Sequence, residues 1–309
     1  MRGANDVSTW SAAQAERYAQ VGHGADGALF LDPHLRKALS AEVLRGKDVI
    51  DLGTGAGRFA GYALSNGAGN VIGVDINEAM VEQARRDLAG ESGELPSNLR
   101  LEVGDVGSLT EVDSASQDVL MSILVGCNLP AETFDAHFEE AMRIARPGAT
   151  FIVAAPNSLA VPFTSKGSNR DMQNDVDGLW EEENECDVIA AKRAISGLGN
   201  RVLRATFVLD PSDNRPVLVT YADFHGVEPG DPIIRKIPGL AVDNNWHVAQ
   251  EYTDAAKAAG WGITNVEENC FNDADARANY NFKKPDDERL GHSYVGNPPF
   301  LLMTLKKAA

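Results

Sequence analysis

The stretch Val49-Ile50-Asp51-Leu52-Gly53-Thr54-Gly55-Ala56-Gly57-Arg58 decides the fold. Its apolar start predicts a strand. The glycines that follow predict a tight turn where a ligand comes close to the backbone. Further along, Asp75 ends the next predicted strand, where a carboxylate can accept both hydroxyls of a ribose. The glycine loop, the strand end and the acid, in this order, indicate a nucleoside-binding site.

The residues around this stretch alternate between strand and helix patterns. Strands are predicted at residues 48–52, 70–75, 100–103, 118–124 and 150–155, and helices at residues 58–65, 78–88 and 134–144. The last of these helices is predicted to end at Arg146-Pro147-Gly148. This alternation predicts an α/β fold with a parallel sheet that helices cover on both faces.

The alternation stops near residue 157 and resumes near residue 246. The intervening residues are polar and rich in turn formers, with one predicted hairpin of residues 202–209 and 216–223. A helix (248–259) and two strands (262–266 and 299–305) follow. We therefore divide the chain into an N-terminal and cofactor-binding α/β core (1–156), an inserted cap that forms a substrate region (157–245), and the end of the core (246–309).

Composition narrows the range of partners. The chain has 309 residues, with 45 Asp and Glu against 28 Lys and Arg, which gives a net charge of -17. Because nucleic-acid binding normally depends on neutralising phosphates with Lys and Arg, we expect neither nucleic acid nor membrane as a partner. The three cysteines are widely spaced, which favours reduced thiols, a cytoplasmic protein and no metal site.

The spacing of the glycines distinguishes between nucleoside cofactors. Nicotinamide enzymes favour G-x-G-x-x-G, which places a pyrophosphate at a helix N-terminus, whereas this loop reads G-x-G-x-G. Asp51 also stands two residues before the first glycine. A carboxylate there would repel a pyrophosphate and attract the ammonium group of an amino acid. This favours S-adenosyl-L-methionine, which has a ribose and an amino-acid tail but no phosphate.

The sequence resembles the class I S-adenosylmethionine-dependent methyltransferases over roughly residues 49–153. The resemblance implies a doubly wound, Rossmann-like, seven-stranded sheet whose last strand is antiparallel, with an inserted cap after the fifth strand. It implies that the glycines line the methionine part of the cofactor, that Asp75 binds the ribose, and that Asp105 and Val106 contact the adenine. The residues that it places at the cofactor are Asp51, Gly53, Gly55, Gly57, Asp75, Ile76, Asp105, Val106 and Ile123.

The resemblance also implies an in-line methyl transfer, which requires alignment and exclusion of water more than a reactive side chain. His247, at the start of the last predicted helix, is the candidate catalytic base. The alternative is a helix N-terminal residue that bonds the backbone. Candidate residues of the substrate pocket are Trp10, Tyr18, His225, Trp246 and Tyr294.

Several functional readings stay open at this point. We expect a small-molecule acceptor that is methylated on O, N or C, and we also consider a homodimer. The alternatives are a non-catalytic S-adenosylmethionine-binding protein and an NAD(P)-dependent oxidoreductase.

The tetrapeptide Asn297-Pro298-Pro299-Phe300 resembles a motif of enzymes that methylate amino groups on adenine or on a glutamine amide. In those enzymes the motif follows the fourth strand, a position that residues 122–127 occupy here. Because proline is tolerated at the first residue of a strand, the tetrapeptide is predicted to begin the final strand.

Overall fold

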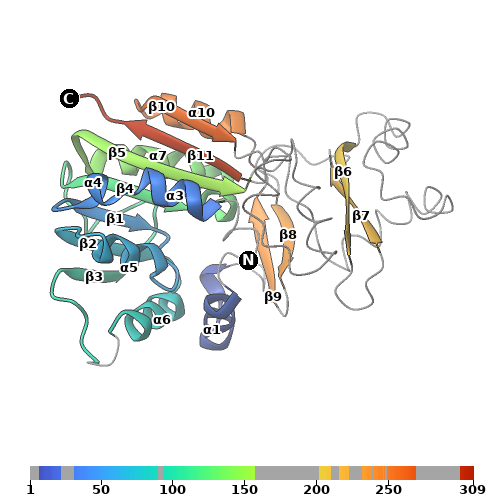
Figure 1. Ribbon diagram of the computed structural model, residues 1–309, viewed down its shortest axis with the longest axis horizontal. Helices are drawn as coiled ribbons and strands as arrows, with labels where there is room; N and C mark the ends of the chain where they lie inside the picture. The colour runs from blue at the N-terminus through green and yellow to red at the C-terminus, as the bar shows by residue number, and fades with distance from the viewer. Residues whose placement is uncertain are drawn as a thin grey trace.

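The computed structural model describes residues 7–21, 31–89, 93–156, 202–209, 216–222, 232–237, 240–245, 247, 249–268 and 300–309. A sheet of seven strands runs through the described core, in the order β10-β11-β5-β4-β1-β2-β3 (Figure 1). Its strands are β1 (Asp48–Leu52), β2 (Asn70–Asp75), β3 (Leu99–Val103), β4 (Gln117–Ile123), β5 (Ala145–Pro156), β10 (Gly262–Glu268) and β11 (Phe300–Lys306).

The pairing of the strands confirms the expected sheet. Strands β1 to β5 pair in parallel, whereas β11 pairs antiparallel with both β5 and β10. The arrowhead of β11 in Figure 1 therefore points opposite to that of β5. The strand order reverses at β1, which lies between β2 and β4. In open α/β sheets, such a switch point is where a ligand crevice forms beyond the carboxyl ends of the strands.

Helices cover both faces of this sheet (Figure 1). One face carries α3 (Asp32–Ala38), α4 (Ala41–Leu44), α5 (Arg58–Ser65) and α6 (Glu78–Ala89), and the other carries α7 (Ala131–Ile144) and α10 (Ala249–Ala258). Strand β1 shows the alternation directly: Val49 packs with the first group, and Ile50 and Leu52 pack with the second. Because both faces are buried, the strand reads as a nearly continuous apolar run.

Two boundaries of the core differ from the sequence prediction. Strand β5 begins at Ala145, so Arg146-Pro147-Gly148 lies inside the strand and does not follow a helix end in a loop. Ala145, at the C-terminus of α7, is already extended (φ -68°, ψ 135°), so the chain passes from helix to strand without a turn. Strand β11 begins at Phe300, which is buried and pairs with Pro156. The buried strand start agrees with the reading of the tetrapeptide, although Asn297, Pro298 and Pro299 lie outside the described residues.

The inserted region contains two described hairpins. The first, β6 (Val202–Leu209) with β7 (Pro216–Ala222), is the predicted one. The second, β8 (Pro232–Ile237) with β9 (Leu240–Asn245), was not predicted, and only two residues connect its strands. Strand β9 contacts α1 (Ala12–Val21) and the short turn η4 (Gly126–Asn128) that follows β4. The second hairpin therefore lies at the carboxyl edge of the parallel strands (Figure 1).

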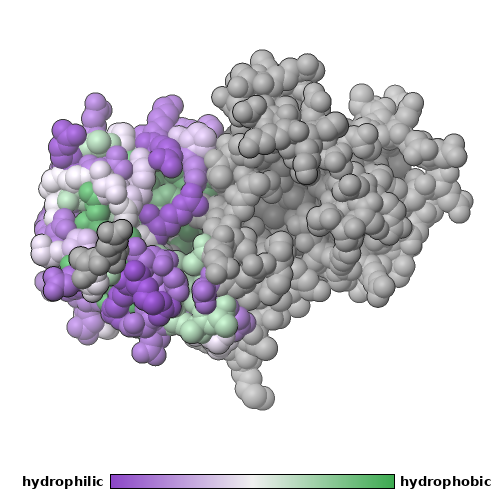
Figure 2. Space-filling model, turned by 60° about the horizontal axis from the view of Figure 1, so that its bottom comes forward, coloured by the Kyte–Doolittle hydropathy of each residue, from purple (hydrophilic) through white to green (hydrophobic). Residues whose placement is uncertain are grey.

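The face of the described residues that Figure 2 shows is mostly hydrophilic. In the view of Figure 2, hydrophobic residues of the described part show only as small patches between polar ones. Within the described residues, no helix combines the length and apolar character that crossing a bilayer requires.

Candidate active site

The glycine loop after β1 has a conformation that only glycine adopts easily. Gly53, Gly55 and Gly57 have φ values of 70°, 54° and 82°. The space is also restricted: a Cβ on Gly53 would lie 2.5 Å from Cγ2 of Val125. The amides of Gly53 and Thr54 donate to the carbonyl of Val74, at 2.7 and 2.8 Å, which fixes the loop to the end of β2. Backbone angle and space together explain the G-x-G-x-G pattern.

Asp51 lies beneath this loop and holds it on α5. Its side chain is only 2% exposed, and Oδ2 accepts hydrogen bonds from the Thr54 hydroxyl at 2.8 Å and the Ala60 amide at 3.0 Å. Burial raises the pKa of the Asp51 carboxyl to about 7, against the opposing effect of these two hydrogen bonds, and the nearby charge of Asp75 raises it further. Asp51 therefore supports the loop, and no cationic partner among the described residues contributes to its pKa.

We expect the stability of the ligand-free protein to fall as the pH rises from about 4 to above 7. The folded state keeps the Asp51 proton up to about pH 7, whereas the unfolded chain loses it near its ordinary pKa of 3.8. The unfolded state therefore binds fewer protons in this window, and ionising Asp51 costs a few kcal/mol, by roughly 1.4 kcal/mol per pKa unit. Asp51→Asn keeps an oxygen for Thr54 and Ala60 but does not titrate.

Urea denaturation between pH 5 and pH 8 checks this prediction. The Asp51→Asn variant should lose less stability across the range than the wild type, while Asp87→Asn, at an exposed position on α6, should follow the wild type. Equal pH dependence in wild type and Asp51→Asn would show that Asp51 is already ionised in the folded protein.

Asp75 stands at the carboxyl end of β2, as predicted. Its Oδ2 accepts the Gly55 amide at 2.8 Å, and its Oδ1 accepts the Asn77 amide at 2.9 Å. Burial raises the pKa of the Asp75 carboxyl, and the two backbone hydrogen bonds oppose the rise. Each carboxylate oxygen has a further lone pair, so the group can accept two ligand hydroxyls without leaving the loop.

The ends of β3 and β4 lie at the same edge of the sheet as the glycine loop. Asp105 follows β3 and accepts the Gly107 amide at 2.8 Å, and Val106 beside it is 5% exposed. Ile123 ends β4 at 7% exposed. Leu124, the next residue, has a φ of 61°, an uncommon value for a residue with a side chain. This bend brings Val125 against Gly53, a contact between β4 and the glycine loop that no motif in the sequence indicates.

The N-terminal segment packs on the glycine loop. Trp10 and Tyr18 lie with their ring centroids 5.2 Å apart and pack with Ala56 of the loop and Met80 of α6. The Trp10 carbonyl accepts the side-chain amide of Asn77 at 3.1 Å. Trp10 Nε1 is buried and finds no acceptor among the described residues. The other three predicted pocket residues, His225, Trp246 and Tyr294, lie outside the described part of the chain.

His247 is 3% exposed, and its ring is fixed on three sides. Nε2 lies 2.9 Å from the carbonyl of Leu129, the ring stacks on Phe134 at 4.0 Å, and Nδ1 lies 3.6 Å from Glu251. An imidazole that donates to a carbonyl cannot accept a proton at the same nitrogen. This geometry supports the structural alternative, in which His247 holds the turn after β4, and its role as a base stays an untested prediction.

We expect His247→Leu to lower the unfolding free energy by about 1–3 kcal/mol, because the Leu129 carbonyl loses its donor. The variant should keep methyl transfer within about tenfold of the wild type at temperatures where it is folded. Thermal unfolding and initial rates measured on the same samples check both parts. A rate loss of a thousandfold or more with unchanged stability would instead assign His247 as the base.

The described residues also contain no group of three or more His, Cys, Asp or Glu that could hold a metal ion.

Comparison with known proteins indicates which family has a site of this kind. Residues 49–148 match a family model described as a methyltransferase domain. The chain is 32% identical over 162 residues to the ribosomal protein L11 methyltransferase of Deinococcus radiodurans, which covers 51% of this chain and 57% of that protein. It is 32% identical over 167 residues to the arsenite methyltransferase of Halobacterium salinarum, which covers 53% of this chain and 39% of that protein. The chain therefore spans about half the length of these relatives, or less.

A solved structure of an S-adenosylmethionine-dependent methyltransferase from Mesorhizobium loti shows the same fold. Its TM-score is 0.54 at 20% identity, over 88% of this chain and 96% of the other.

Proposed function

We propose, from the premise that residues 49–148 are a methyltransferase domain of the class I S-adenosylmethionine-dependent family, that this protein transfers a methyl group to a small-molecule acceptor. The observation that carries the proposal is the pair of acids at the glycine loop. Asp75 ends β2 with both oxygens on backbone amides, and Asp51 lies buried beneath the same loop. The match to a methyltransferase domain leaves the oxidoreductase alternative without support.

The residues at the carboxyl ends of the parallel strands fit S-adenosyl-L-methionine, the cofactor of this family. Burial, with a smaller contribution from the charge of Asp75, raises the pKa of Asp51 to about 7, so the loop holds two carboxyl groups whose ionised forms a cationic ligand would stabilise. S-adenosylmethionine carries a sulfonium and an ammonium group, whereas a pyrophosphate would add negative charge. Trp10 Nε1 is a buried hydrogen-bond donor beside the loop, and it could donate to an oxygen of the ligand. The chemistry therefore favours this cofactor over a dinucleotide.

When bound, S-adenosylmethionine supplies a methyl group on a positively charged sulfur, ready for in-line displacement. The role of the protein would be to position this cofactor. Asp75 would hold the ribose hydroxyls, the glycine loop, supported by Asp51, would hold the amino-acid end, and Asp105 and Val106 would face the adenine. The residues Ile76 and Ile123 add apolar contact. Such alignment, with water kept out, provides most of the catalysis that this chemistry needs.

Two observations favour a small acceptor: the position of the inserted region and the negative net charge of the chain. Strand β9 contacts both α1 and η4, so the insertion and the N-terminal helix approach the same edge of the sheet. We propose that these elements enclose the acceptor, with Trp10, Tyr18, His225, Trp246 and Tyr294 as pocket residues. The net charge of -17 disfavours a nucleic acid. A cytoplasmic location and a homodimer remain part of the proposal.

A two-step experiment tests the function. Calorimetric titration with S-adenosylhomocysteine and with NADH comes first, and we expect binding of the former alone. A screen with radiolabelled S-adenosylmethionine follows, over small phenols, amines, carboxylic acids, arsenite and purified ribosomal protein L11. Transfer to a small molecule supports the proposal, and transfer to the protein alone overturns its acceptor class. Binding without transfer to any acceptor would favour a non-catalytic cofactor-binding protein.

A further inference from the structure

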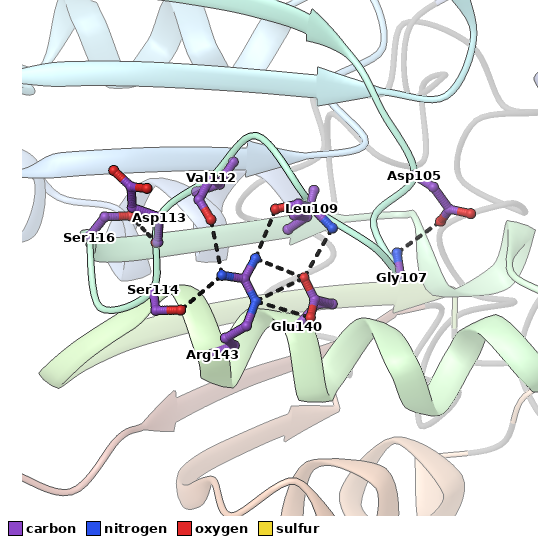
Figure 3. Close-up of polar contacts among 9 residues, drawn as sticks. All are labelled: Asp105, Gly107, Leu109, Val112, Asp113, Ser114, Ser116, Glu140 and Arg143. Atoms are coloured by element: carbon purple, nitrogen blue, oxygen red, sulfur yellow. Dashed lines mark hydrogen bonds and ion pairs between the residues drawn. The ribbon is translucent and has the colours of Figure 1, made fainter.

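The loop between β3 and β4 carries the predicted adenine contacts but has little backbone pairing of its own. Within it, a single isolated bridge joins Asp105 and Ser108. Backbone groups outside a helix or sheet need other partners, because unpaired polar groups are costly to bury. Here several of the partners come from one helix, α7, which packs beside the loop (Figure 3).

Every N–H group of the Arg143 guanidinium on α7 has an acceptor, either in this loop or on Glu140 of the same helix. Nη2 donates to the Leu109 carbonyl at 2.8 Å, and Nη1 donates to the Val112 carbonyl and the Ser114 hydroxyl, both at 3.0 Å. The remaining N–H groups, on Nε and Nη2, bond Glu140 one turn earlier. Glu140 in turn accepts the Leu109 amide at 3.0 Å, so the pair holds both the donor and the acceptor of one loop residue (Figure 3).

His137 lies on the same face of α7, one turn before Glu140. It is 1% exposed, and its Nε2 lies 2.9 Å from the Ser122 hydroxyl of β4. Burial lowers the pKa of His137 to about 4, although the Val106 backbone and the Asp105 carboxylate favour the protonated ring. Nδ1 is buried without a hydrogen bond of normal geometry among the described residues. His137 is therefore a neutral polar residue placed between β4 and the residues expected to read the adenine.

Gly107 is where α7 fits the loop most tightly. A Cβ on Gly107 would lie 2.9 Å from Cγ2 of Thr133 and 3.5 Å from Cβ of Ala136. The amide of this same glycine donates to Oδ1 of Asp105. The distance between Gly107 and α7 therefore sets where the Asp105 carboxylate points, and it leaves Oδ2 of Asp105 for another donor (Figure 3).

We propose that this face of α7, formed by Thr133, His137, Glu140 and Arg143, positions the adenine-reading loop and so sets the selectivity of the protein for the cofactor base. The four residues are positioning residues, since they act through Asp105 and Val106. The inference rests on the proposed function. The inference goes beyond the proposed function because it names residues outside the cofactor site on which recognition of the adenine 6-amino group depends.

Equilibrium binding of two probes tests this inference: S-adenosylhomocysteine and S-inosylhomocysteine, in which an oxygen replaces the 6-amino group. We expect the wild type to prefer the first by tenfold or more, because the inosine base places an acceptor oxygen, in place of the 6-amino donor, against the Asp105 carboxylate. Arg143→Gln and Gly107→Ala should bring the ratio close to one. Arg146→Gln removes another arginine, which binds Asp48 and Asp118 at the starts of β1 and β4, and it should keep the wild-type ratio.

A compensating substitution distinguishes a loss of loop position from a general loss of folded structure. Thr133→Ser removes the methyl group that a Cβ on Gly107 would meet, so Gly107→Ala combined with Thr133→Ser should recover most of the selectivity that Gly107→Ala loses. Hydrogen exchange of the Leu109 amide in the ligand-free protein should be faster in Arg143→Gln, with amides of β1 and β4 unaffected.

The outcomes are distinguishable. If the wild type discriminates and the Arg143 and Gly107 variants discriminate equally well, the inference is wrong and the proposed function stands. If the wild type binds neither probe, the proposed function fails, and the inference fails with it. Failure of the double variant to recover selectivity would also overturn the positioning role of α7.

Discussion

Asp75→Ala should weaken binding of S-adenosylhomocysteine by roughly a hundredfold or more. The ionised Asp75 is expected to accept both ribose hydroxyls, and a hydrogen bond to a charged group contributes about 1.5–3 kcal/mol. The variant also removes the acceptor of the Gly55 and Asn77 amides, so the loop loses its fixed position. Asp75→Asn keeps one oxygen but not the charge, so its affinity for S-adenosylhomocysteine should lie between those of Asp75→Ala and the wild type. Calorimetric titration measures all three.

The control for this series is Asp87→Ala, at an exposed position on α6, which should bind as the wild type does. Because burial raises the pKa of Asp75, wild-type affinity should also fall as the solution is made more acidic and the carboxylate gains a proton. Affinity that is unchanged in Asp75→Ala would remove this residue from the ribose site.

Gly53→Ala should destabilise the protein by about 2–4 kcal/mol and reduce cofactor binding in parallel. Part of the cost is the φ of 70°, at about 1 kcal/mol for a residue with a Cβ. The rest is the 2.5 Å contact with Val125, since forcing an extra methyl group into a packed site costs about 1–3 kcal/mol. Chemical denaturation measures the total.

The chain offers a matched control for each part of this cost. Gly46 has a φ of 69°, and a Cβ there would meet no atom within 4 Å, so Gly46→Ala should show the backbone cost alone. Val125→Ala combined with Gly53→Ala should recover the contact cost but not the backbone cost. Equal destabilisation by Gly46→Ala and Gly53→Ala would mean that Val125 does not constrain the loop.

Most of the core follows from the sequence because its signals are local. The run from Val49 to Leu52 is apolar on both faces of a strand, and the glycines that follow occupy left-handed positions. The positions of Asp51 and Asp75 could also be predicted, because Asp51 lies next to the last residue of a predicted strand and Asp75 ends the following one. The order of strands and the antiparallel β11 required the family resemblance, because strand pairing is not a local property.

The features that the sequence analysis missed depend on contacts between distant segments. Val125 meets Gly53 only because Leu124 adopts a positive φ. The polar face of α7 spans three turns, and the loop residues that Glu140 and Arg143 bind lie about thirty residues earlier in the chain. The hairpin of β8 and β9 has short strands inside a polar region, where turn signals outweigh the alternation. For His247, the sequence left a catalytic base and a backbone-bonding residue as alternatives, and the contact of its Nε2 with the Leu129 carbonyl supports the second, while its role as a base stays a prediction.

The most direct test of the central claim is a crystal structure of the protein with S-adenosylhomocysteine. The account predicts that the Asp75 carboxylate accepts both ribose hydroxyls, that the amino-acid end lies over Gly53 to Gly57 near Asp51, and that the adenine amino group faces Asp105. A ligand bound elsewhere, or a ribose that does not contact Asp75, would contradict the account.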